Sequence, residues 1–99
     1  MLSEEVEARV RVEIEGWTHS DEAQSFFRQA RIFKKSELVD VVGWDEPYAK
    51  AQLRFLTSNR LILSTRDGQR KTPVFISLLR AMHTGVRLAD VPTEDEAPF

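Results

Sequence analysis

The sequence contains no cysteine, which excludes disulfide bonds and every metal site built from thiolates. No apolar stretch approaches the roughly 20 residues that a helix needs to cross a bilayer. The first residues, Met1 to Glu5, lack the apolar core of a secretory signal peptide. These absences predict a cytoplasmic protein that makes no contact with a membrane.

Motifs for catalysis are lacking as well. The chain shows no Gly-rich phosphate loop, no nucleophile elbow and no paired-carboxylate motif. Its two histidines, His19 and His83, are far apart, and neither lies in a motif that binds metal. The sequence therefore predicts a protein that is not an enzyme and that carries no metal and no cofactor.

What the chain does have is an uneven distribution of charge. Its 99 residues, 41% hydrophobic and 30% charged, fit one ordinary globular domain. The net charge is −2, yet residues 28–80 hold eleven basic and five acidic side chains, while both ends are acidic. We expect a single domain over residues 1–85 and a flexible acidic tail over residues 86–99. The basic middle is where an anionic partner would bind.

Residues 6–14 fit two kinds of secondary structure. Apolar residues occupy every second position from Val6 to Ile14, which is the period of a half-buried strand. Ser3, followed by two glutamates, would instead cap a helix in which Val6, Val10 and Ile14 share one face. The β-branched content favours the strand. Such a strand could pair with a second copy in a homodimer or join the protein's own sheet.

Three helices are expected between residues 20 and 59. Ser20 is a good N-cap, so the first helix covers about residues 20–30. A short extended bridge at residues 31–33 leads to a second helix over about residues 35–42, which Gly43 can end. Asp45 can cap the third helix, which runs to about residue 59. Its buried face is expected to consist of Ala49, Leu53 and Leu56.

A hairpin and a short helix complete the expected elements, which together make an α+β fold. Residues 60–65 and 72–76 are β-prone, and Asp67-Gly68 between them is a strong signal for a hairpin turn. Gly85 can end the last helix. The apolar residues with helical spacing in that helix are Phe75, Leu78, Leu79 and Met82.

This order of elements resembles the winged helix-turn-helix family over residues of about 21–80. Residues 33–38 (Phe-Lys-Lys-Ser-Glu-Leu) look like the family's entry into its second helix, and residues 42–47 look like its turn. Residues 53–62 are similar to the third helix leading into the wing. Lys34 and Trp44 depart from the pattern, because the family often has a Ser or Thr cap and a smaller turn residue there. The resemblance implies a winged helix-turn-helix with an extra N-terminal strand and a short C-terminal helix.

The resemblance also implies DNA binding, with the third helix in the major groove and the wing on the backbone. Opposite its buried face, the third helix presents Pro47, Ala51, Arg54 and Ser58, with Lys50 on one flank and Tyr48 and Phe55 on the other. Of these, Arg54 and Lys50 are expected to read the groove. Arginine can bond guanine bidentately, and a small residue permits close approach to bases. We expect a duplex DNA-binding protein that acts in transcription regulation, replication or partition.

Two further basic groups are expected to hold phosphates. Lys34 and Lys35 face the positive end of a helix dipole, which a bound phosphate would compensate. The hairpin tip carries Arg66, Arg70 and Lys71, as a wing that grips the DNA backbone would. A solvated turn that only keeps the protein soluble is the alternative for the tip.

Protein partners remain an alternative to DNA. Winged helices also serve as adaptors, and the overall charge of −2 suits that role. Tyr48, Gln52 and Phe55 form a stripe that could stack on bases, contact a partner or be covered by the chain's own ends.

The last residues, 92–99, resemble the acidic Pro-Phe tail with which bacterial single-stranded DNA-binding proteins recruit other proteins. By that resemblance Phe99 would fill a pocket on a partner. The tail could otherwise compete with DNA for the basic middle, or only solubilise the chain.

Overall fold

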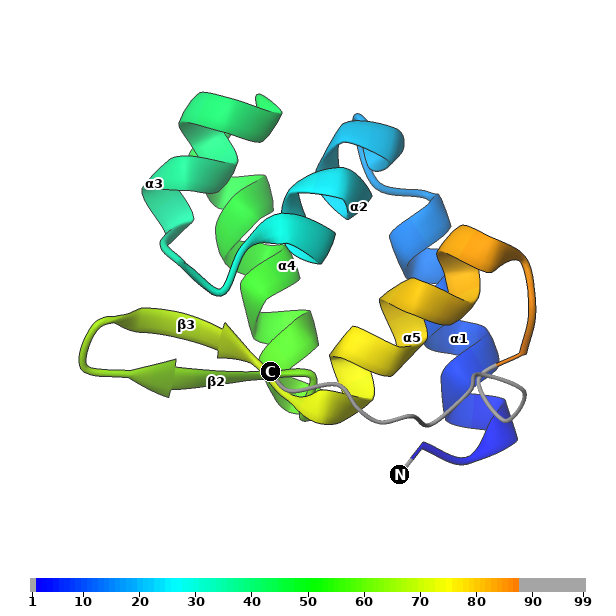
Figure 1. The fold of residues 1–99 in the computed structure, drawn as a ribbon. Helices are drawn as coiled ribbons and strands as arrows, with labels where there is room; N and C mark the ends of the chain where they lie inside the picture. Colours follow the sequence, from blue (N-terminus) through cyan, green and yellow to red (C-terminus); the bar gives the residue numbers. More distant parts are fainter. Residues whose placement is uncertain (1, 88–99) are drawn as a thin grey trace.

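The computed structural model describes residues 2–87, which form a small α+β fold (Figure 1). The three strands make one antiparallel sheet in the order β1-β3-β2, and the β2–β3 hairpin extends away from the helices (Figure 1). In chain order the elements are α1 (Glu4–Glu15), α2 (Ser20–Gln29), β1 (Ile32–Phe33), α3 (Lys35–Glu37), the π-helical η1 (Leu38–Val42), α4 (Glu46–Ser58), β2 (Ile62–Thr65), β3 (Gly68–Lys71) and α5 (Pro73–Thr84).

The N-terminal segment is a helix, so the expected extra strand is wrong. The Ser3 hydroxyl accepts a hydrogen bond from the backbone N–H of Val6 at 3.2 Å, and three glutamates lie in the first turn. Val10 and Ile14 are buried whereas Val12 is 70% exposed, so burial follows the helical period and not the alternation. The argument for a homodimer through a free N-terminal strand falls with this correction.

Helix α2 and the segment after it lie where the sequence predicted helices, with two differences. Ser20 does not cap α2, because its hydroxyl donates to the carbonyl of Ile14 at 2.7 Å and His19 precedes the helix in a left-handed conformation. The predicted second helix is one turn of α3 that continues as η1, and Gly43, with a φ of 94°, ends it as expected.

The hairpin has its turn one residue earlier than predicted. Strands β2 and β3 pair from Ile62↔Lys71 to Thr65↔Gly68, so the loop consists of residues 66 and 67. Gly68 has a φ of 137°, and a Cβ there would lie 2.9 Å from the carbonyl oxygen of Phe33 in β1. Glycine thus lets β3 run close beside β1.

The strand predicted over residues 72–76 is wrong, because α5 begins there. The Thr72 hydroxyl accepts from the N–H of Phe75 at 3.4 Å, and Pro73 occupies the first helical position, where its missing N–H has no cost. The helix predicted from the apolar spacing is confirmed and ends at Gly85 as expected. Its buried side chains include Phe75, Leu78 and Leu79.

An aromatic cluster forms the centre of the core. The Phe27 ring lies 5.3 Å from Trp17, 5.1 Å from Phe33 and 5.6 Å from Phe75, measured between ring centroids. These four side chains come from the α1–α2 connection, α2, β1 and α5, so the cluster joins both halves of the chain.

After α5 the chain returns to α1. The guanidinium of Arg11 donates to the carbonyl of Val86 at 3.0 Å, so the start of the predicted tail is held against the domain. Residues 88–99, with Phe99 and the acidic residues before it, lie outside the described residues. In the described part of the chain, no helix combines the length and apolar character needed to span a bilayer.

Candidate nucleic-acid interface

Helix α4 presents one polar face to solvent. Its start is fixed by Asp45, whose carboxylate accepts from the N–H of Tyr48 at 2.9 Å, and by a proline in its first turn. Ala49 and Leu56 are buried as predicted, and Leu53 is half-buried. The side chains predicted to face the groove are all exposed, namely Lys50, Ala51, Arg54 and Ser58.

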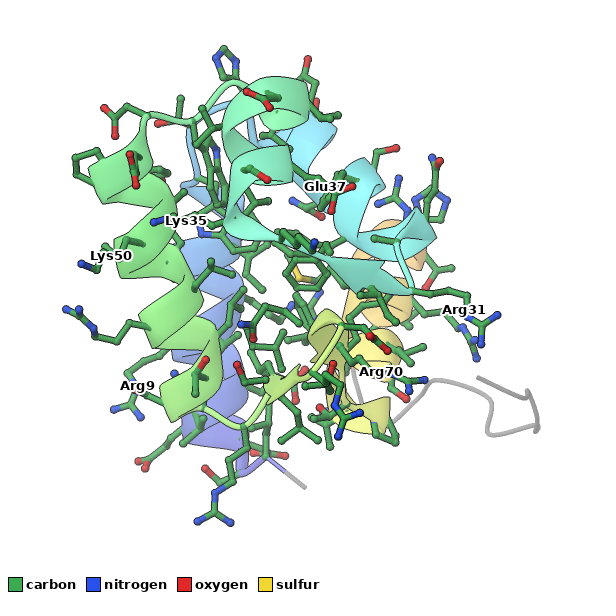
Figure 2. All side chains as sticks on the ribbon, turned by 90° about the vertical axis from the view of Figure 1, so that its left-hand side faces the viewer. Arg9, Arg31, Lys35, Glu37, Lys50 and Arg70 are labelled. Carbon is green, nitrogen blue, oxygen red and sulfur yellow. The ribbon has the colours of Figure 1, made fainter. Side chains whose placement is uncertain are left out.

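The two exposed cations of α4, Lys50 and Arg54, are available to a ligand. Within residues 2–87, neither Lys50 nor Arg54 has an ion pair or a side-chain hydrogen bond. Figure 2 shows Lys50 and Arg9, which comes from α1, projecting on the same side of the molecule. Arg9 was missed from the sequence because residues 6–14 were assigned to a strand. We call Arg9, Lys50, Ala51, Arg54 and Ser58 the α4 face.

Tyr48 belongs to the interior side of α4 and is withdrawn as a DNA contact. Its hydroxyl accepts from the backbone N–H of Thr18 at 3.1 Å, and its ring packs on Trp44 with centroids 5.1 Å apart. Gln52 is 7% exposed and accepts from the indole N–H of Trp17 at 2.8 Å. Tyr48 and Gln52 of the predicted stripe therefore contact the chain's own N-terminal part, which favours one of the three alternatives, and Phe55 is half-buried.

Of the two lysines at the start of α3, Lys35 forms an ion pair and Lys34 is exposed to solvent. Lys35 pairs with Glu46 at 2.8 Å, and its ammonium, with a smaller effect of Lys50, lowers the pKa of the Glu46 carboxyl. Lys34 is exposed, and its backbone N–H donates to Glu37 at 2.9 Å. The carboxylates of Glu37 and Glu46 thus already offset the positive charge of the lysines and of the helix dipole at the start of α3, so a bound phosphate is not needed for that purpose.

The three cations assigned to the hairpin tip lie in different surroundings. Arg66 is exposed in the loop, and Arg70 is exposed on β3. Lys71 turns inward, where its ammonium donates to the carbonyl oxygens of Phe27 and Arg28 at the end of α2, and burial lowers its pKa. Lys71 stabilises the fold there and is withdrawn as a phosphate contact.

The exposed cations of the sheet lie apart from those of α4. Figure 2 shows Arg31 and Arg70 on one side of the view and Lys50 and Arg9 on the other. Arg66 lies in the loop of the β2–β3 hairpin, which projects from the body of the protein (Figure 1). The labelled cations Arg31 and Arg70 therefore do not extend the surface that Lys50 and Arg9 form.

The described residues do not form a metal site. No group of three or more metal-binding side chains occurs within residues 2–87. The predicted partner contact, Phe99, lies outside that range. No protein-family model, curated protein or solved structure matches this chain.

Proposed function

We propose that this protein binds duplex DNA through the α4 face, with Arg66 of the hairpin loop on the backbone. The observation that carries the proposal is the exposed row on α4, in which Lys50 and Arg54 lie one helical turn apart and, within residues 2–87, have neither an ion pair nor a side-chain hydrogen bond. Ala51 between them leaves room for base edges. Arg9 extends the same positive surface onto α1 (Figure 2).

The arrangement of elements supports this proposal. The α3–η1 segment and α4, with a tight turn at Gly43 between them, precede a projecting antiparallel hairpin, and β1, which lies between α2 and α3, joins the hairpin in one sheet. That order is the one that led us to the winged helix-turn-helix resemblance, in which the third helix enters the major groove. We propose that α4 has that role and that the protein is no enzyme.

Salt-dependent binding tests the proposal. Fluorescence anisotropy would measure the affinity of the full chain for random duplex and single-stranded DNA at low and moderate salt. We expect a duplex preference and an affinity that falls steeply with salt, because each phosphate contact releases counterions. Lys50→Ala should reduce the salt slope by about one unit. The matched control is Arg31→Ala, an exposed cation on the other side of the view in Figure 2.

Binding to neither form of DNA would overturn the proposal and leave a protein-interaction module. Equal losses in both variants would overturn the assignment of DNA binding to the α4 face. A chain that ends at residue 89 lacks four acidic side chains, Asp90, Glu94, Asp95 and Glu96, so we compare its DNA affinity directly with that of the full chain. If it binds more tightly, the acidic end competes with DNA for the basic surface.

A further inference from the structure

A groove of about 640 Å³ lies between α2, β1 and η1. It is separate from the α4 face, since Figure 2 shows Glu37 beside α2 and away from Lys50. The residues that line it are Asp21, Glu22, Ser25, Phe26, Gln29, Ala30, Ile32, Glu37 and Val41.

The floor of this groove is apolar and open to water. Ile32 is 40% exposed and Val41 is 66% exposed, so two of the four large apolar side chains that the described residues leave exposed lie here. Phe26 and Ala30 extend the apolar surface towards the core. Apolar surface gathered in a groove marks a place where another chain gains free energy by binding.

The rim of the groove carries charge of one sign. Asp21 and Glu22 lie at the start of α2, Glu37 lies at the end of α3, and no basic residue lines the groove. Within residues 2–87, the carboxylates of Asp21 and Glu22 have no ion pair. Glu37 accepts a single hydrogen bond, from the backbone N–H of Lys34. The rim therefore repels nucleic acid and attracts cations.

We propose that this groove binds a basic, amphipathic peptide segment of a partner protein. Apolar side chains of the segment contact Phe26, Ile32 and Val41, and its lysines or arginines pair with the acidic rim. The chain's own end does not suit the groove, because residues 88–99 hold four acidic side chains and no basic one. The groove would let the protein hold a partner while the α4 face stays accessible.

A pair of synthetic peptides tests this inference. Two labelled peptides of equal length, one of Leu and Lys and one of Leu and Glu at helical spacing, would be titrated with the full chain in an anisotropy assay. We expect only the Leu/Lys peptide to bind. Val41→Ser should weaken its binding about fivefold to tenfold by removing apolar contact area. Asp21→Asn with Glu22→Gln should weaken it and flatten its salt dependence.

Matched variants make the result specific. Val12→Ser changes an equally exposed helical valine outside the groove, and Glu13→Gln with Glu15→Gln removes two exposed acids from α1. Both should leave peptide binding unchanged, as should Arg54→Ala, which tests the DNA proposal separately. Equal binding by Val41→Ser and the wild type would overturn the inference. So would a wild-type dimer in sedimentation that Val41→Ser dissociates, because a second copy would then fill the groove.

Discussion

The hydrogen bond between Trp17 and Gln52 should be worth a measurable part of the protein's stability. The indole N–H donates to the Gln52 side-chain oxygen at 2.8 Å, and the two residues are 4% and 7% exposed. Gln52 is the buried polar side chain of α4, so this bond ties the α1–α2 connection to the helix that we assign to DNA. Removing one partner leaves the other buried without a hydrogen bond, which costs about 1–3 kcal/mol.

A double-mutant cycle separates this bond from simple packing. Trp17→Phe should lower the free energy of unfolding by about 2–4 kcal/mol, because the unpaired oxygen and the lost ring volume both contribute. Gln52→Met keeps the side-chain length and should lower it by about 1–3 kcal/mol. The double variant should lose less than the sum, with a coupling of about 1–2 kcal/mol, because no unpaired polar group remains.

Urea unfolding followed by far-ultraviolet circular dichroism would measure the four free energies. Thr72→Ala provides the control, since the Thr72 hydroxyl accepts from the N–H of Phe75 and is hydrogen-bonded to neither Trp17 nor Gln52. Its effect should add to that of Gln52→Met within about 0.5 kcal/mol. If the effects of Trp17→Phe and Gln52→Met were simply additive, the bond would contribute nothing and our account of the interior side of α4 would fail.

Three further changes test other contacts. Gly68→Ala should lower the free energy of unfolding by about 1–3 kcal/mol in urea titrations, because its φ is 137° and the new Cβ would meet the Phe33 carbonyl; no loss would refute the close approach. Glu46→Gln removes the anion that holds Lys35, so duplex DNA should bind several-fold more tightly at low salt; weaker binding would contradict the α4 proposal. Lys71→Met should destabilise the fold without changing the salt slope of DNA binding. Because burial lowers the pKa of Lys71 below 10.5, the wild type should gain stability relative to Lys71→Met as the pH rises towards that value; a falling difference would refute the burial.

The sequence predicted α4 and its exposed face because local signals and packing agree there. Asp45 caps the helix, a proline fits its first turn, and the apolar spacing of Ala49 and Leu56 is that of the buried side. The surroundings of the cations were not predictable in the same way. Lys71 is turned inward by carbonyl groups of α2, 43 or 44 positions away in sequence, and no local pattern contains that information.

The two wrong assignments of secondary structure have different causes. Residues 6–14 carry an apolar pattern that fits both periods, and tertiary packing of Val10 and Ile14 selects the helix over β propensity. At residues 72–76 a local signal was present and overlooked, since Thr72 followed by Pro73 is a typical helix start.

The chain has two tryptophans, and Trp44 packs on Trp17 of the aromatic cluster with centroids 5.2 Å apart and ring planes at 70°. Both are almost fully buried, and the single tyrosine, Tyr48, is close enough to Trp44 to pass its excitation energy to the indole. Intrinsic tryptophan fluorescence therefore reports on the interior of the protein and responds little to binding at its surface. A spectral shift on adding DNA or peptide would mean that the interior itself had rearranged, and following surface binding requires a dye on the ligand.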